Sequence, residues 1–497
     1  MKTSQVLTLY ANLASLSPNS ITSAQNSKKT GVNARSYFPS LFANLFRISL
    51  LGVVLLSACE PKIDDFLPSA TTLENVSKVP TPVGTPVPPV TPGTPVPPTV
   101  PTIEKAAFYI APNGNDNNKG DITQPFATLT KAWTVIASGD LVYMRGGTYR
   151  FSSNVELNGK DGTAGNLTKI WAYPGEKPII DYSHKTWAGG TFALNLYPSY
   201  LHLKGIRVTN MVQSSSPVHT GMRVVGSNTI LENCEVDRIG GYGYKIDNNA
   251  NNVLFLNCDA HHCGDPFNNY ENGNGFNATT NSGTGHRFDG CRAWLNGDDG
   301  FDTYGANGYI EYNNCWSFKN GYFDNGTPTS GDGEGFKIGP NRNGIITTTL
   351  RKYTNCIAFD NYFRGFAQSA ETLNTFETEI YNCFTFRNRS VGFSFDVVGV
   401  QNIVKNNVSY LDGASKNIST ASLNTNNNWN GGVTVTYADF MSIDATGADG
   451  PRQSDGSLPN LQFLRLASGS DLINAGANVG IPYSGSAADL GPFEYSN

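Results

Sequence analysis

The sequence predicts an all-β fold, a parallel β-helix with turns of about 24 residues and a short capping helix at its N-terminal end. Composition is the first observation: 52 glycines, 27 phenylalanines, 23 tyrosines and only 15% charged residues favour strands joined by tight turns. The second is a set of cysteines separated by 24, 33, 24, 41 and 27 residues: Cys234, Cys258, Cys291, Cys315, Cys356 and Cys383. The third is a Gly-Phe pair that recurs at 275–276, 300–301, 335–336, 365–366 and 392–393. The shortest cysteine spacing recurs and the longer ones add a loop to it, which is typical of a solenoid.

An apolar run near the N-terminus ends at a cysteine. The run that follows Arg47 has about ten apolar residues, too few to span a bilayer. Its end, Leu-Ser-Ala-Cys59, resembles a bacterial lipoprotein signal, which implies cleavage before Cys59 and acylation of that residue. We therefore expect residues 1–58 to be an N-terminal extension and signal peptide. The protein would be an exported bacterial lipoprotein at the cell surface, the outer membrane or the periplasmic face. The alternative is a cysteine that follows an apolar run by chance.

A tether and linker are expected next, followed by the folded domain. Residues 59–105 contain a polar stretch and then a Pro/Thr-rich one that favours extended polyproline conformations, which suits a spacer. The folded domain is predicted to occupy residues 106–497, with an irregular tail from about 431. Its first elements are expected to be a strand at 107–110, a helix marked by apolar residues at 126, 129, 133 and 136, and a strand then a turn at 140–149. This helix would cover the sheet edge that the first turn of a β-helix exposes.

The repeated cysteines are expected to be reduced and buried. Seven cysteines remain when Cys59 is set aside, and evenly repeated small residues suit a packed interior. Stacking along a column would also allow disulfides in an exported protein, so that alternative stays open. Most of these cysteines directly follow an asparagine, and four are followed five residues later by another, at 296, 320, 361 and 388. Stacked asparagines predict an interior ladder in which each side chain bonds to an adjacent turn.

Alignment of the Gly-Phe pairs places chemically active residues on adjacent turns. Asp302 and Lys337 fall one strand spacing apart, roughly 4.8 Å in a parallel sheet. Asn274, Asp299 and Glu334 share a neighbouring column. The arrangement predicts a cluster of acids with a lysine beside it.

Three of these acids lie within five residues of one another and suit a cation. Asp298, Asp299 and Asp302 would repel one another strongly unless a cation or protons intervene. Together with the amide oxygen of Asn274 they form an all-oxygen set that fits Ca²⁺ better than zinc. The alternative is a solvated acidic turn that binds nothing.

Lys337 beside such a site is suited to act as a base. Elimination on a uronic-acid polymer requires removal of the C5 proton, which is acidic only when the neighbouring carboxylate is neutralised, as a bound Ca²⁺ would do. A nearby cation also disfavours the protonated lysine. Arg364 on the next turn, or less readily Lys319, is a candidate for holding a substrate carboxylate. The alternatives are that Lys337 is only a salt-bridge partner and that the other two are surface charges.

At these residues the chain resembles polysaccharide lyase family nine, the β-helical pectate lyases. The motifs that carry the resemblance are Asn-Gly-Asn-Gly-Phe at 272–276, Cys-Arg-Ala-Trp-Leu-Asn-Gly-Asp-Asp-Gly-Phe-Asp at 291–302, Gly-Glu-Gly-Phe-Lys-Ile-Gly at 333–339 and Asn-Cys-Ile-Ala-Phe-Asp-Asn at 355–361. The resemblance extends over most of residues 106–497. It implies a right-handed parallel β-helix and a calcium-dependent enzyme that cleaves polygalacturonate by β-elimination. Carried over by motif, Lys337 is the base, and Asp298, Asp299 and Asp302 bind Ca²⁺.

Two positions depart from the pattern of the family. It has a fourth aspartate where this chain has Asn274, and usually an amide where this chain has Glu334. Because the two positions share a column, we expect Ca²⁺ still to bind, with Glu334 as a possible further ligand. The change also leaves open a uronate polymer other than pectate.

Two other classes of function remain open. A glycoside hydrolase of the polygalacturonase type would use paired acids on the same fold, but the Gly-His-Gly and Arg-Ile-Lys motifs of that family are missing. A non-catalytic surface glycan-binding protein is the other. The expected partner is an acidic polysaccharide, the membrane is expected only through a lipid anchor at Cys59, and a monomer is expected. Nucleic acid is not expected at a net charge of -5. His261 and His262 are not expected to share a metal, because neighbours on a strand point to opposite faces.

Overall fold

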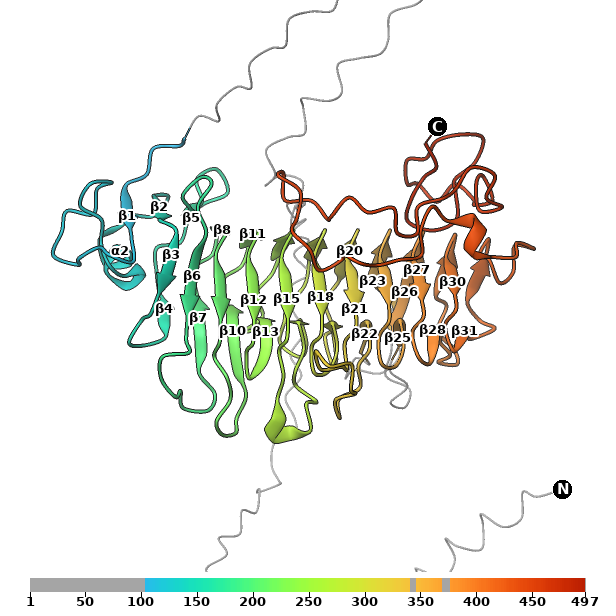
Figure 1. Ribbon diagram of the computed structural model, residues 1–497, viewed down its shortest axis with the longest axis horizontal. Helices are drawn as coiled ribbons and strands as arrows, with labels where there is room; N and C mark the ends of the chain where they lie inside the picture. The colour runs from blue at the N-terminus through green and yellow to red at the C-terminus, as the bar shows by residue number, and fades with distance from the viewer. Residues whose placement is uncertain (1–102, 340–345, 369–375, 497) are drawn as a thin grey trace, which may run out of the picture. The chain divides into compact units, whose positions relative to one another are not determined.

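Three long parallel sheets wind around a common core and form a right-handed β-helix (Figure 1). The structure is a computed structural model, and it describes residues 103–339, 346–368 and 376–496. Each strand pairs in parallel with the equivalent strand of the next turn, so the predicted fold class is confirmed.

The elements below are those of the described residues. The first sheet consists of β1 (Phe108–Ile110), β2 (Leu141–Met144), β5 (Thr168–Ala172), β8 (Leu201–Lys204), β11 (Ile230–Glu232), β14 (Leu254–Leu256), β17 (His286–Asp289), β20 (Ile310–Asn313), β23 (Ile346–Thr354), β26 (Phe376–Tyr381), β29 (Ile403–Lys405) and β32 (Leu423–Thr425). The second sheet consists of β4 (Val155–Leu157), β7 (Phe192–Leu196), β10 (His219–Val224), β13 (Gly241–Ile246), β16 (Phe276–Asn277), β19 (Phe301–Asp302), β22 (Phe336–Ile338), β25 (Phe366–Gln368), β28 (Val391–Phe395) and β31 (Ala414–Ile418). The third sheet consists of β3 (Gly147–Tyr149), β6 (Pro178–Asp181), β9 (Arg207–Thr209), β12 (Glu235–Asp237), β15 (Asp259–His261), β18 (Arg292–Trp294), β21 (Trp316–Phe318), β24 (Ile357–Phe359), β27 (Phe384–Phe386) and β30 (Val408–Tyr410). Outside the sheets lie helix α2 (Leu129–Val135) and the 3₁₀ turns η2 (Pro266–Asn268) and η3 (Tyr437–Asp439).

The Gly-Phe pairs stack as the sequence predicts. Their rings occupy one register position on consecutive strands of the second sheet, with centroids 4.6–5.3 Å apart: Phe276, Phe301, Phe336, Phe366 and Phe393. A Cβ on Gly300 would lie only 2.0 Å from the Ser317 hydroxyl oxygen, so the close packing beneath this column requires glycine there. The stack therefore fixes which residues face each other on adjacent turns.

The repeated cysteines are reduced and buried, as expected. The asparagines that precede five of them adopt the left-handed conformation, with φ of 51–54°. Gly290 takes the same conformation, with φ of 59°, before Cys291. Asparagine and glycine tolerate that region better than other residue types, which explains why the two exchange at this corner.

A second set of asparagines forms the predicted ladder, in the turn between third-sheet and second-sheet strands. Each side-chain amide donates a hydrogen bond of 2.8–3.0 Å to the side-chain oxygen on the next turn, in the order Asn296, Asn320, Asn361, Asn388 and Asp412. Asp412 also accepts hydrogen bonds from the Thr385 and Ser409 hydroxyls. Burial raises the pKa of the Asp412 carboxyl to about 6 despite these donors.

Helix α2 lies at the N-terminal end of the solenoid and contacts β1 and β4, so the expectation of a capping helix is confirmed (Figure 1). The helix is shorter than the apolar pattern suggests. It begins at Leu129 because the Thr128 hydroxyl caps it, accepting a hydrogen bond of 3.0 Å from the Lys131 N–H. Phe126 is buried but precedes the helix. Across the described residues, no helix has the length and apolar character that a bilayer crossing would require.

The C-terminal tail packs against several turns of the solenoid. It runs along the outer face of the third sheet (Figure 1) and buries residues such as Leu458 and Phe463 against Phe359 and its neighbours. Arg452 extends back to β15, where its Nη2 lies 2.6 Å from Asp259 Oδ1. The tail therefore covers several turns of the third sheet.

Stability is expected to depend on pH through His286. This side chain is buried, its Nε2 donates to the Ser282 carbonyl at 2.7 Å, and its Nδ1 accepts from the Val253 N–H, so the ring must be neutral. Burial lowers its pKa from 6.5 to about 4. The unfolded chain therefore takes up a proton first, and about 3 kcal/mol of stability is lost as the pH falls from 6.5 to 4.

The matched variant is His286→Gln, which keeps one donor and one acceptor but does not titrate. Denaturant unfolding should show that the wild type loses about 3 kcal/mol more stability than this variant when the pH falls from 7 to 4. Parallel stability curves for the two proteins would contradict the assignment.

Candidate active site

Two neighbouring strands of the second sheet bring together the residues that the sequence singles out. β19 and β22 pair with Asp302 opposite Lys337, so the predicted register is confirmed. Phe336 and Ile338, on either side of Lys337, are buried in the core. Because alternate residues of a strand face opposite sides, Lys337 projects from the outer face of the sheet.

The ammonium of Lys337 is held by two carboxylates. Its Nζ lies 3.1 Å from Asp299 Oδ2 and 2.6 Å from Asp332 Oδ2, and its side chain is 14% exposed. Burial alone would lower the pKa of this lysine, but the charges of Asp299, Asp302 and Asp298 outweigh burial and raise it. Among these acids, Lys337 carries its proton.

Asp298 and Asp299 form the buried floor of the cluster. Their Oδ1 atoms accept backbone N–H groups of the next turn, from Asp332 at 2.8 Å and from Glu334 at 2.9 Å. Burial, followed by repulsion from neighbouring carboxylates, raises the pKa of both aspartates well above the usual range. Asp299 Oδ2 is buried and accepts no hydrogen bond from the residues that the structure describes, which leaves it facing the Lys337 ammonium.

Asn274 and Asp302 are bound to each other beside this floor. The Asn274 amide donates to Asp302 Oδ2 at 2.9 Å, and its oxygen accepts the Asp299 N–H at 3.1 Å. Asp302 Oδ1 accepts the Tyr304 N–H at 2.7 Å. The amide oxygen that the sequence offers as a cation ligand is therefore already engaged.

Asp332 is a member of the cluster that sequence reasoning missed. One carboxylate oxygen from each of Asp298, Asp299 and Asp332 lies within 4.8 Å of the others. Asp332 stands in a loop between β21 and β22 that is inserted into the repeat, so it has no register position. The one available signal is its place directly before the motif at 333–339.

The two proposed substrate contacts lie in different places. Arg364 pairs with the fully buried Glu334 and stacks on Phe363, with its own side chain 22% exposed. Burial raises the pKa of Glu334 although Arg364 and Lys337 oppose the shift. Lys319, by contrast, is an exposed residue that follows β21 of the third sheet.

Charge and geometry together fit a hard cation. The acids outnumber the cationic groups that face them, Lys337 and Arg364; they are Asp298, Asp299, Asp302, Asp332 and Glu334. Ca²⁺ prefers carboxylate oxygens, and two oxygens on one Ca²⁺ lie up to about 5 Å apart. The Asp298, Asp299 and Asp332 oxygens meet that spacing, and Asp299 Oδ2, which accepts no hydrogen bond from the described residues, could bind the ion.

Comparison with known proteins decides the family. A sequence model described as Pel9A-like, right handed beta helix region, matches residues 108–428. The chain belongs to this Pel9A-like family. It is a polysaccharide lyase of family nine, as the motifs indicate.

Relatives of this Pel9A-like chain cover most of it. Pectate lyase L of Dickeya dadantii (strain 3937) is 32% identical over 401 residues, which are 78% of this chain and 91% of the relative. The crystal structure of pectate lyase Pel9A has a TM-score of 0.69 at 30% identity and covers 78% of this chain and 96% of its own. A solved structure named rhamnogalacturonan lyase has a TM-score of 0.63 at 28% identity and covers 73% and 96%.

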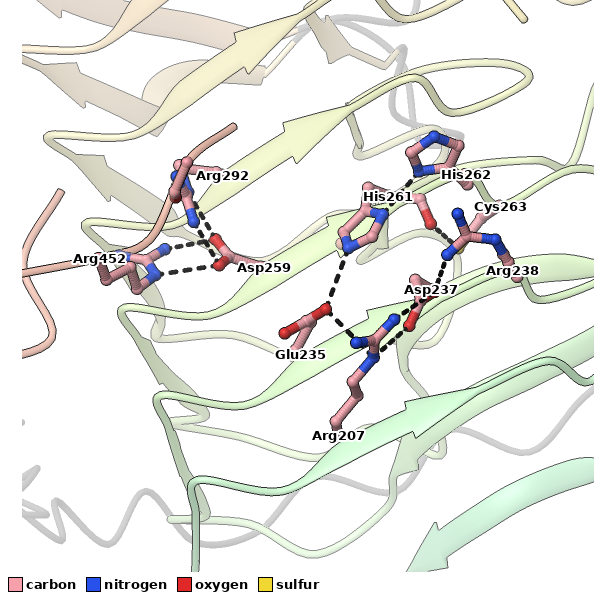
Figure 2. Close-up of polar contacts among 12 residues, drawn as sticks. Arg207, Glu235, Asp237, Arg238, Asp259, His261, His262, Cys263, Arg292 and Arg452 are labelled. Atoms are coloured by element: carbon pink, nitrogen blue, oxygen red, sulfur yellow. Dashed lines mark hydrogen bonds and ion pairs between the residues drawn. The ribbon is translucent and has the colours of Figure 1, made fainter. Parts of the chain in front are cut away.

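A second acidic cluster of the Pel9A-like domain lies on the third sheet (Figure 2). Glu235, Asp237 and His261 each bring one possible ligand atom within 4.8 Å of the others. Arg207 binds Asp237 through two hydrogen bonds of 2.8 and 2.9 Å and lies 3.2 Å from Glu235, and Arg238 also pairs with Asp237. Two guanidinium groups thus balance two carboxylates, so this cluster, unlike the first, has no excess charge to attract a cation.

The expectation that His261 and His262 face opposite sides is wrong. His262 follows β15 with a left-handed φ of 56°, which breaks the strand alternation, and the two Nδ1 atoms lie 2.6 Å apart (Figure 2). Each ring also meets a carboxylate, His261 at Glu235 and His262 at Asp324. The geometric argument against a shared metal therefore does not hold, although both rings are already engaged.

Proposed function

We propose that this lyase cleaves a uronic-acid polymer, with pectate as the first substrate to test, by Ca²⁺-assisted β-elimination with Lys337 as the base. One observation carries the proposal: Lys337 Nζ lies outside the core and 3.1 Å from Asp299, in a cluster with excess negative charge. The pectate lyase names of two of its relatives support the substrate class. The rhamnogalacturonan lyase adds a second polymer to test.

Each site residue has a defined task in this mechanism. Ca²⁺ held by Asp298, Asp299 and Asp302 would neutralise the substrate carboxylate and so acidify the C5 proton. With the charges of these acids neutralised by the ion, Lys337 would give up the proton it carries in the free protein, and its neutral Nζ could then take the C5 proton. The C4–O4 bond breaks, a C4–C5 double bond forms, and the leaving oxygen takes up a proton. Arg364, which binds Glu334 through one nitrogen, has further N–H groups to hold a uronate carboxylate.

One assay separates the candidate functions. The protein is incubated with polygalacturonate or rhamnogalacturonan, with Ca²⁺ or with a chelator, and the absorbance of unsaturated products is followed together with reducing ends. Absorbance and reducing ends that both need Ca²⁺ support the proposal. Reducing ends alone would indicate the hydrolase alternative, and the absence of both on every uronate polymer would leave a glycan-binding protein.

Replacement of Arg364 should weaken substrate binding more than catalysis. A bidentate contact to a carboxylate contributes about 1.5–3 kcal/mol, so Arg364→Ala is expected to raise KM roughly 10- to 100-fold with a smaller change in kcat. Lys319→Ala is the matched comparison and should change KM less than about 2-fold, because an exposed charge contributes little. Equal effects of both variants would contradict a specific role for Arg364.

We further propose that the chain is a monomeric, exported bacterial lipoprotein that meets the membrane only through acylated Cys59. Cys59, the signal peptide and most of the linker lie outside the described residues. The support is the apolar run that ends in Leu-Ser-Ala-Cys59. A mature protein whose mass shows an unprocessed or unacylated N-terminus would contradict this proposal.

A further inference from the structure

We infer that Asp332 is a ligand of the proposed Ca²⁺ and supplies the negative charge that Asn274 does not bring. The inference rests on the proposed function, because it concerns the same ion. Both ends of the Asn274 side chain are used within the protein, by the Asp299 N–H and by Asp302 Oδ2. Asn274 also brings no charge, so a further carboxylate would strengthen the set that the aspartates at 298, 299 and 302 begin.

Asp332 has the position that such a ligand needs. Its carboxylate belongs to the group of three whose oxygens lie within 4.8 Å of one another. Its side chain is 56% exposed, whereas Asp298 and Asp299 are buried, so it stands at the open side of the cluster where an ion enters. The buried Asp299 oxygen without a hydrogen bond faces the same space, because both carboxylates contact Lys337 Nζ.

The backbone around Asp332 is fixed against the turn that carries Asp298. The Asp332 N–H donates to Asp298 Oδ1, and the Thr329 hydroxyl donates to the Gly297 carbonyl oxygen. A Cβ on Gly331 would lie 2.4 Å from that carbonyl oxygen and 3.0 Å from Asp298 Oδ1. Glycine at 331 is therefore what lets the loop approach so closely. These contacts hold the backbone of Asp332 in a fixed position beside Asp298.

A competing role for Asp332 is purely as the partner of Lys337, 2.6 Å from its ammonium. The two roles can be separated in a Lys337→Met background, where no ammonium is left to balance. If Asp332 is a ligand, it still contributes to Ca²⁺ binding in that background. If Asp332 acts only by pairing with Lys337, it no longer affects Ca²⁺ binding there.

The experiment is titration calorimetry of the full chain with CaCl₂. Asp332→Asn is expected to weaken Ca²⁺ binding about 10-fold or more, because affinity follows the number of charged ligands. Asp324→Asn is the matched control, since Asp324 lies on the same loop and pairs with His262; it should bind Ca²⁺ as wild type does. In the Lys337→Met background the loss caused by Asp332→Asn should persist.

Results that differ from these expectations would contradict either the role of Asp332 or the proposed function. Wild-type affinity in Asp332→Asn, or a loss that disappears in the Lys337→Met background, would refute the inference and leave the proposed function standing. An equal loss in Asp324→Asn would refute a specific role of Asp332. A wild-type protein that binds no Ca²⁺ but eliminates would refute the calcium part of the proposed function itself.

Discussion

Replacing Lys337 with methionine is expected to lower kcat on the polymer by about 10²- to 10⁴-fold, the usual contribution of a general base. Methionine keeps most of the side-chain length but cannot take a proton. The Ca²⁺ site should survive and bind more tightly, since the ammonium that contacts Asp299 and Asp332 no longer competes with the ion. Initial rates from unsaturated-product absorbance, together with calorimetry of Ca²⁺ binding, measure both effects.

Lys337→Arg distinguishes a base from a positive charge. Arginine keeps the charge among the same carboxylates but stays protonated in proteins, so it cannot accept the C5 proton. We expect this variant to be about as inactive as Lys337→Met. Activity within about tenfold of wild type would show that position 337 supplies only charge and that another group is the base.

Replacing Asp299 with asparagine is expected to weaken Ca²⁺ binding by about 3 kcal/mol, or about 100-fold, and to abolish most activity at low Ca²⁺. Asp299 is fully buried, and its Oδ2 accepts no hydrogen bond from the described residues. Calorimetry measures the binding, and the rate at increasing Ca²⁺ shows whether saturation restores activity.

The matched control is Glu235→Gln in the second acidic cluster. Arg207 already neutralises Glu235, so this variant should leave Ca²⁺ affinity unchanged. Asp299→Asn should also unfold at the same temperature as the ion-free wild type or higher, because burial and repulsion raise the pKa of Asp299 and so disfavour its charge. A lower unfolding temperature would mean that the lost affinity reflects damage to the fold.

The spatial neighbours of residues at repeated positions could be predicted from the sequence. The phenylalanine stack and the pairing of Asp302 with Lys337 follow from the Gly-Phe spacing, because a parallel β-helix puts equivalent residues directly above one another. The asparagine ladder follows for the same reason. In such a fold the period alone carries three-dimensional information.

Residues on insertions could not be placed in that way. Asp332 lies in a loop whose length does not follow the repeat. Its contact with Asp298 therefore depends on tertiary packing that the spacing of residues in the sequence does not indicate. Arg452 binds Asp259 from a tail without any repeat. His262 was misjudged for a local reason: a single left-handed residue ends the strand alternation.

The asparagine ladder also limits where coils could be added to the solenoid. Its side-chain amides all donate in one direction, and the row ends at Asp412, whose carboxylate accepts from the Asn388 amide. Tandem duplication of an internal coil between Asn296 and Asn388 would preserve this row of hydrogen bonds. A coil added beyond Asp412 could not continue the row in this direction, because a carboxylate has no N–H to donate. Among the described residues, the row can therefore be lengthened only by coils inserted before Asp412.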